Sequence, residues 1–175
     1  DFGETVEGRP MVAAVVGNPL PTGQTVPSAD DDQRIVCLLL GNIHSGECAG
    51  KEALLELLRE LSQNGDSQLL EKMVLIFVPN YNADANERIG PGQYHRPGQL
   101  GPEQGMGLRE NAQQLDLNRD FVKMEAPETR SLVRLMNQYD VDLFIDCHTT
   151  NGSKHRYDLT YDYPHNPAVF PGIKQ

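Results

Sequence analysis

Runs of apolar residues along the chain predict four strands. Residues 35–40 and 73–78 are continuously apolar and strand-length, a pattern typical of strands buried on both faces of a sheet. We interpret residues 141–147 as a third buried strand and residues 11–16 as a further strand near the start of the chain. The chain therefore carries enough buried strands to form the centre of a layered domain.

Two segments between these strands have the spacing of amphipathic helices. Residues 46–61 are predicted to form a helix, because leucines recur on one face and Asn64 and Gly65 supply a stop. Residues 127–139 are predicted to form a second helix, which Pro127 opens in its first turn. The segments 17–28 and 80–114 are rich in Gly, Pro or Asn and lack periodicity. A connection as long as the second is usually functional.

The order of these elements predicts an α/β fold. We expect a three-layer sandwich with a mixed, mostly buried central sheet and helices on both faces. In open sheets of this kind, binding sites gather at the carboxyl ends of the strands. His44 follows the strand predicted at 35–40, and His148 follows the strand predicted at 141–147. Both histidines are therefore expected at the edge of the sheet where a site would form.

Composition excludes several classes of function. The 175 residues suffice for one domain with a sizeable core. The net charge is −10 and no basic patch is visible, so we expect no nucleic-acid partner. No apolar run is long enough to predict a membrane segment. The three cysteines have no ligand spacing, which disfavours zinc held by thiolates.

Two histidines and a glutamate form a candidate metal site. A catalytic zinc ion takes three protein ligands from His and carboxylate groups and keeps one position open. His44 and Glu47 are separated by two residues at a predicted strand-to-helix turn, so their side chains can meet at one ion. His148 is the candidate for the third ligand. On these residues alone, a chance spacing beside an ordinary core histidine explains the pattern about as well.

Five segments together resemble the zinc metallocarboxypeptidases of the carboxypeptidase A type. The segment GNIHSGECAGKEALLELLREL resembles the turn and helix that carry the first two zinc ligands of that family, and VDLFIDCHTT resembles the strand that delivers the third. LDLNRDF is similar to the family's Asn-Arg motif, APETRSL to the opening of the helix that follows it, and GETVEGRPM to the entry into the early strands. These matches follow the family's order and identify residues 1–175 as a partial catalytic domain.

The resemblance implies a role for each matched residue. His44, Glu47 and His148 would bind one Zn²⁺ ion, and Asp116 would orient the first histidine, as carboxylates beside ligating histidines often do. Asn118 and Arg119 would hold the terminal carboxylate of a peptide substrate, for which a guanidinium fork is well shaped.

One further arginine is implied as catalytic. Arg109 resembles the arginine that stabilises the oxyanion of the reaction, and Arg88 is its rival in the same loop, which we interpret as a loop-ordering residue. Asp146, two residues before His148, is a neighbour on the same face of its strand, and we assign it no role. His95, His155 and His165 lie outside the matched segments and are not expected to be ligands.

The implied activity is zinc-dependent hydrolysis of a C-terminal peptide bond. In the family, the glutamate general base, a substrate-capping tyrosine and the specificity-pocket residues lie well beyond the third ligand, so we expect them after Gln175 and expect residues 1–175 alone to be inactive. Two alternatives stay open. One is an N-acyl amino-acid deacylase or a peptidoglycan amidase on the same scaffold, and the other is an inactive homologue that binds peptides or carbohydrate.

Overall fold

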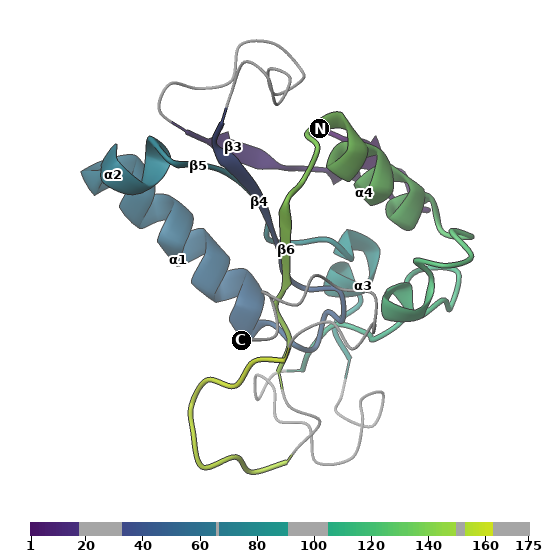
Figure 1. Ribbon diagram of the computed structural model, residues 1–175. Helices are drawn as coiled ribbons and strands as arrows, with labels where there is room; N and C mark the ends of the chain where they lie inside the picture. Colours follow the sequence, from purple (N-terminus) through teal and green to yellow (C-terminus); the bar gives the residue numbers. More distant parts are fainter. Residues whose placement is uncertain (18–32, 66, 91–104, 150–152, 163–175) are drawn as a thin grey trace.

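A four-stranded mixed sheet with helices on both faces forms the centre of the molecule (Figure 1). The structure is a computed structural model, and it describes residues 1–17, 33–65, 67–90, 105–149 and 153–162. The sheet has the order β3-β5-β4-β6. β4 (Ile35–Leu40) is parallel to β5 (Met73–Val78) and to β6 (Leu143–Asp146), whereas β3 (Ala14–Val16) is antiparallel to β5. The expected α/β class and mixed sheet are confirmed.

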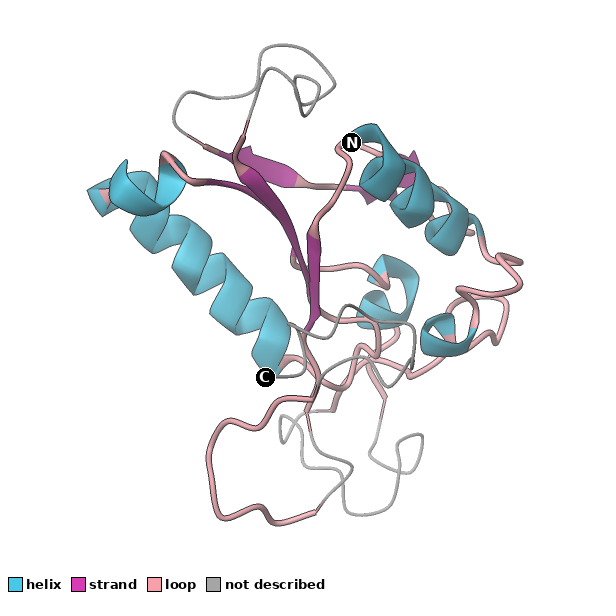
Figure 2. Ribbon diagram, in the orientation of Figure 1, coloured by secondary structure: helices cyan, strands magenta, loops and turns pink. Residues whose placement is uncertain are grey.

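The remaining elements flank this sheet or precede it (Figure 2). In chain order they are β1 (Gly3–Glu4), β2 (Pro10–Met11), α1 (Ala49–Asn64), α2 (Ser67–Leu70), α3 (Ala83–Glu87), a 3₁₀ helix (Leu117–Arg119) and α4 (Pro127–Gln138).

Alternation along β4 builds a separate core on each face of the sheet. Val36, Leu38 and Leu40 point into a cluster that includes residues of α4, while Cys37 and Leu39 point into a cluster that includes residues of α1. Successive strand residues face opposite sides of a sheet, so a continuous apolar run is required where both sides are covered. Figure 1 shows α1 and α4 on opposite sides of the strands. This arrangement is the expected three-layer sandwich.

The strand predicted at residues 11–16 is two strands in different sheets. β2 pairs with β1 in a small antiparallel hairpin, whereas β3 joins the main sheet beside β5. Between them Val12 is exposed, where the chain passes from one sheet to the other. The apolar pattern could not indicate this break, because it depends on partners that are distant in sequence.

Two other boundaries differ from the prediction. α1 begins at Ala49 rather than at residue 46, because the Glu47 N–H donates to the His44 carbonyl in a turn that precedes the helix. β6 spans Leu143–Asp146 and is not a buried strand, since Leu143 and Ile145 are exposed. Among the described residues β6 pairs with β4 alone. Its apolar composition therefore predicted the strand correctly but predicted more burial than the structure shows.

The predicted loops contain some regular structure. Within residues 80–114 the chain forms α3, which ends at Glu87. Its five residues are too few for a helical period to be visible in the sequence. Most of the other predicted loop, at residues 17–28, lies outside the described residues. Among the described residues, no helix combines the length and apolar character needed to cross a bilayer.

Asp120 fixes the entry into α4, and its removal tests how the chain holds that helix. One carboxylate oxygen accepts the Glu125 N–H and the other accepts the Ala126 N–H, both at 2.9 Å. Burial raises the pKa of Asp120, but these N–H donors more than offset it, so the pKa lies below its ordinary value of 3.8. The carboxylate therefore contributes stability above pH 3.8, and this contribution is lost as the pH falls through the lowered pKa.

We expect Asp120→Ala to lower the free energy of unfolding at neutral pH by about 1–3 kcal/mol, because the buried Ala126 N–H and the part-buried Glu125 N–H lose their acceptor. Denaturant unfolding between about pH 6 and pH 2 measures this, and the difference from the wild type should shrink toward the acid end. A loss of stability that is the same at every pH would contradict the role of the charged carboxylate.

Candidate metal centre

The loops that follow β4, β5 and β6 meet at one edge of the sheet, because these three strands are parallel. The loop after β4 is shaped by Asn42, which is fully buried and has a φ of 64°. Asn tolerates this left-handed conformation better than most residues. Backbone bonds from Tyr81 to Gly41 and from Asn82 to Asn42 join this loop to the one after β5. The turn that carries His44 and Glu47 is therefore held on a rigid edge.

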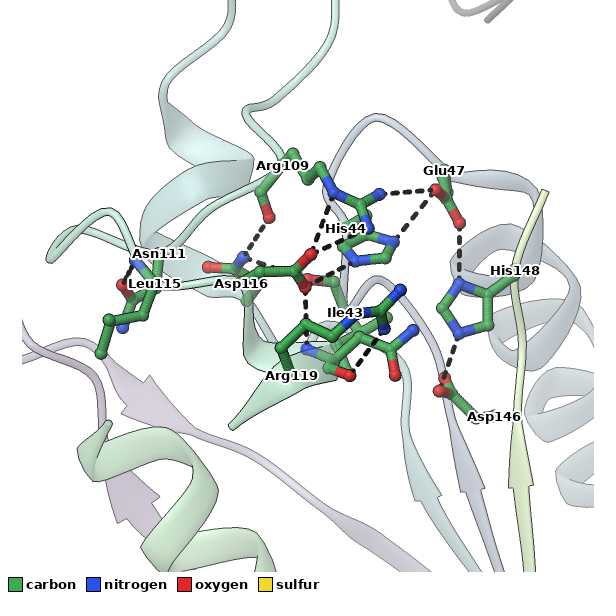
Figure 3. A network of polar contacts seen from close by, with 12 residues as sticks. Ile43, His44, Glu47, Arg109, Asn111, Leu115, Asp116, Arg119, Asp146 and His148 are labelled. Atoms are coloured by element: carbon green, nitrogen blue, oxygen red, sulfur yellow. Dashed lines mark hydrogen bonds and ion pairs between the residues drawn. The ribbon is translucent and has the colours of Figure 1, made fainter. Parts of the chain in front are cut away.

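Figure 3 shows His44, Glu47 and His148 pointing toward one another. Nδ1 of His44 lies 3.0 Å from one carboxylate oxygen of Glu47, and Nδ1 of His148 lies 2.8 Å from the other. One candidate ligand atom from each of the three residues falls within 4.8 Å of the others. Two imidazole nitrogens and a carboxylate oxygen are ligands that Zn²⁺ takes in catalytic sites. The residues present therefore fit the metal that the sequence predicts.

The outward nitrogen of each histidine meets a second carboxylate. Nε2 of His44 lies 3.0 Å from Asp116, and Nε2 of His148 lies 2.8 Å from Asp146. Such a contact fixes a ligating ring by holding a proton on the nitrogen that faces away from the metal. Nδ1 of both rings is therefore the atom that is free to bind an ion.

The charges of these groups are strongly coupled. Burial raises the pKa of Glu47, but hydrogen bonds from His148 and His44 outweigh it and hold the pKa well below its ordinary range. The hydrogen bond with Asp146, followed by that with Glu47, raises the pKa of His148 to about 9. His148 is therefore protonated at neutral pH when no metal is bound. A metal ion that binds its Nδ1 must displace that proton.

Arg109, rather than Arg88, reaches this cluster. Its guanidinium donates to one oxygen of Asp116 through Nε and Nη2, at 3.1 and 2.9 Å, and Nη1 lies 3.6 Å from Glu47. Partial burial raises the pKa of Asp116, but the contacts with His44 and Arg109 leave it lower than usual. Arg88 pairs instead with Glu7 in the N-terminal hairpin.

Asn111 sets the loop between Arg109 and Asp116. Its side-chain oxygen accepts the N–H groups of Gln113 and Leu115, each at 3.0 Å. Its amide nitrogen donates to Glu128 of α4 at 3.1 Å. The loop therefore closes on itself and is fastened to a helix, which places Arg109 and Asp116 side by side.

Asn118 and Arg119 lie on the 3₁₀ helix that follows Asp116. The Asn118 N–H donates to an Asp116 oxygen at 3.0 Å, so Asp116 caps this helix while it contacts His44. Arg119 is exposed, and its guanidinium donates to the carbonyl of Asn118 at 2.9 Å. Among the described residues, no carboxylate pairs with it. The Arg119 backbone N–H donates to the Asp116 carbonyl at 2.8 Å, so both residues belong to the same short turn (Figure 3).

Asp146 contacts Nε2 of His148, although its place in the sequence led us to assign it no role. The signal was present, because residues two apart on a strand share a face and Asp146 precedes His148 by two. A buried carboxylate with other partners fitted that spacing equally well, so the pairing became visible only in the structure. His95 and His165 lie outside the described residues, and His155 is exposed.

The profile of the zinc carboxypeptidases matches residues 1–174. The chain belongs to the zinc carboxypeptidase family. It is 28% identical to human carboxypeptidase D over an alignment of 191 positions, which covers 93% of this chain and 13% of that protein. It is 30% identical over 133 residues to carboxypeptidase E of Caenorhabditis elegans, covering 72% of this chain and 25% of that protein.

Solved structures of carboxypeptidases have the same fold. A metallo-carboxypeptidase from Pseudomonas aeruginosa, in complex with (2-guanidinoethylmercapto)succinic acid, matches with a TM-score of 0.58 and 26% identity. The match covers 87% of this chain and 35% of that one. The chain thus spans well under half the length of these carboxypeptidases.

Asp146 should support zinc binding through His148. Asp146→Ala removes the acceptor of the Nε2 proton, so we expect the zinc dissociation constant of the full-length protein to rise about 10- to 100-fold. Asp142→Ala is the matched control, because Asp142 lies close by in the chain but accepts the backbone N–H of Val36. Competition with a chromogenic chelator measures both. Equal affinities in the two variants would contradict the role of Asp146.

Gly50 should set the distance between Glu47 and His148. A Cβ at Gly50 would lie 2.5 Å from the Cβ of Cys147, the residue before His148. Helix propensity alone predicts that Gly50→Ala stabilises α1 by about 0.5–1 kcal/mol. We expect the clash to prevail, with a net loss of about 1–3 kcal/mol and weaker zinc binding.

The Cys147→Gly background tests the cause of that loss, because it removes the Cβ that the new methyl group meets. We expect Gly50→Ala to weaken zinc binding less there, because only the milder approach to the Cys147 carbonyl oxygen, at 3.2 Å, remains. Chelator competition and denaturant unfolding of the wild type, the two single variants and the double variant give the comparison. A Gly50→Ala variant that is more stable than the wild type, with unchanged zinc affinity, would show that the added methyl group does not clash with the segment after β6.

Proposed function

We propose that the protein containing this chain is a zinc metallocarboxypeptidase that releases the C-terminal residue of a peptide. The observation that carries the proposal is the convergence of two Nδ1 atoms and the Glu47 carboxylate, with the Arg109 guanidinium close to that carboxylate. Membership of the zinc carboxypeptidase family supports it. The deacylase, amidase and inactive-homologue alternatives gain no support from the described residues.

His44, Glu47 and His148 would hold the zinc ion. When bound, zinc polarises a carbonyl group and lowers the pKa of a water molecule. Asp116 and Asp146 keep the Nε2 protons in place, so that both rings present Nδ1. Each of these second contacts comes from a different segment, which restrains the two rings independently.

Asn118 and Arg119 would bind the free carboxylate of the substrate. The exposed guanidinium of Arg119 has no carboxylate partner among the described residues, and the Asn118 backbone is fixed by Asp116. A guanidinium binds a carboxylate through two parallel hydrogen bonds, and a side-chain amide adds direction. A carboxylate held here makes the enzyme act on the last peptide bond of a chain.

Arg109 would stabilise the negative charge that develops on the carbonyl oxygen during hydrolysis. It is a fixed cation, mostly buried and positioned by Asp116 next to Glu47. Positioned donors of this kind act mainly in the transition state. Its contribution should therefore appear in kcat rather than in substrate binding.

The general base is not assigned to a described residue. Glu128 is fully buried and accepts hydrogen bonds from Val6 and Asn111, so it is not available to the substrate. The resemblance to the family puts the base beyond Gln175. We therefore propose that residues 1–175 bind zinc and the substrate carboxylate but do not catalyse the reaction by themselves.

Arg119→Ala tests the proposed function. Removing the guanidinium should lower kcat/KM of the full-length protein for a peptide with a free C-terminus. The expected loss of transition-state stabilisation is about 2–5 kcal/mol. Hydrolysis of the amidated peptide should be slow in the wild type and should change little in the variant. Steady-state kinetics on the peptide pair gives both values.

Arg130→Ala is the matched control, because Arg130 is also an exposed arginine that donates to backbone carbonyls, at Met124 and Glu125. Arg130→Ala should leave kcat/KM unchanged for both the free and the amidated peptide. A wild-type enzyme that cleaves the free and amidated peptides equally well would refute the exopeptidase proposal and would favour the amidase or deacylase alternative.

A further inference from the structure

Asn82 joins the loop that carries His44 and Glu47 to the segment that carries Arg109. It follows β5 and is fully buried. Its backbone N–H donates to the Asn42 carbonyl at 3.2 Å, and its carbonyl accepts the Ser45 hydroxyl at 2.9 Å. Both partners belong to the loop that carries His44. One residue of the β5 loop therefore holds this ligand loop from both sides of the histidine.

The side chain of Asn82 extends this connection to Arg109. Its amide nitrogen donates to the carbonyls of Ile43, at 3.1 Å, and of Arg109, at 3.3 Å. Both partners are acceptors, so the NH₂ group and not the oxygen must face them. Figure 3 shows the carbonyl of Arg109 directed toward this contact. A single amide group thus links the backbone that precedes His44 with the backbone of Arg109.

The other end of the amide adds no hydrogen bond to this connection from the described residues. Its side-chain oxygen is buried and has no hydrogen-bond partner among the described residues. A buried acceptor without a partner destabilises a fold. The hydrogen bonds of this side chain to the described residues therefore run from its amide nitrogen, to the ligand loop and to Arg109.

We propose that Asn82 is a positioning residue, which sets where the Arg109 guanidinium lies relative to His44 and Glu47. The inference rests on the proposed function, in which Arg109 stabilises developing negative charge. The segment of Arg109 also meets the ligand turn through the Ser45 N–H, which donates to Leu108 at 3.1 Å. The amide of Asn82 adds the contact at Arg109 itself.

A double-mutant cycle in the full-length enzyme tests the proposal. Asn82→Ala should lower kcat about 10- to 100-fold, the effect of a displacement of about 1 Å at a reacting centre. KM should change by no more than about threefold, and the protein should keep its zinc. In an Arg109→Ala background, Asn82→Ala should lower kcat by less than about threefold, because the two residues act through one group.

Asn86→Ala is the matched control. Asn86 is also an asparagine in the same segment, and its amide bonds with Asn42 and Lys51 but not with the Arg109 segment. It should keep kcat near the wild-type value. A second measurement needs no activity: amide hydrogen exchange across residues 106–111 should be faster in Asn82→Ala than in Asn86→Ala. Equal exchange would overturn the proposal.

Three further outcomes would also overturn the proposal. In the first, the losses of kcat in Asn82→Ala and Arg109→Ala multiply in the double variant. In the second, Asn82→Ala has the same kcat as Asn86→Ala. In the third, Asn82→Ala loses zinc in proportion to its activity, which would assign Asn82 to the ligand turn alone. If Asn82→Ala does not fold, Asn82→Ser replaces it in the same cycle under the same criteria.

The Arg109→Ala single variant separates this inference from the proposed function. A normal kcat in that variant would refute the role of Arg109, and the inference with it. A low kcat in Arg109→Ala beside a normal kcat in Asn82→Ala would overturn only the role of Asn82.

Discussion

The buried carboxylate of Glu47 is the group on which the arrangement of this site depends. Glu47 is 6% exposed, and an isolated charge in such a place is strongly unfavourable. Its two oxygens are satisfied by His44, His148 and the backbone N–H of Thr149, with Arg109 close by. These partners come from the ends of β4 and β6 and from the loop after α3. One charge therefore draws together three segments that are distant in sequence.

A second set of buried carboxylates fixes the surroundings of the site. Asp84 of α3 accepts hydrogen bonds from Thr5, Glu7 and Arg9 of the N-terminal hairpin. Glu128 of α4 accepts from Val6 in the same hairpin and from Asn111 in the loop beside Arg109. The hairpin thus connects α3, α4 and the Arg109 loop, and the site is built on elements that hold one another in place.

The order of the elements predicted where the candidate ligands lie, and the resemblance to the zinc carboxypeptidases predicted what each matched residue does. His44 and Glu47 share one turn, and His148 ends a strand, so their place at one sheet edge followed from the order of the elements. The role of Asp146 could not be separated from that of a structural carboxylate. The contacts of Asn82 and Gly50 were not predictable, since they are made with residues far along the chain. The same limit explains the break between β2 and β3 and the exposure of β6.

The most direct test of this account is anomalous diffraction at the zinc edge from crystals of the full-length protein. The account predicts one zinc peak, bonded to Nδ1 of His44, Nδ1 of His148 and the carboxylate of Glu47, with the Nε2 atoms still on Asp116 and Asp146. Crystals of a His44→Ala variant should lack that peak. A zinc ion bound through Nε2 of either histidine, or a peak elsewhere with none between these three residues, would contradict the central claim.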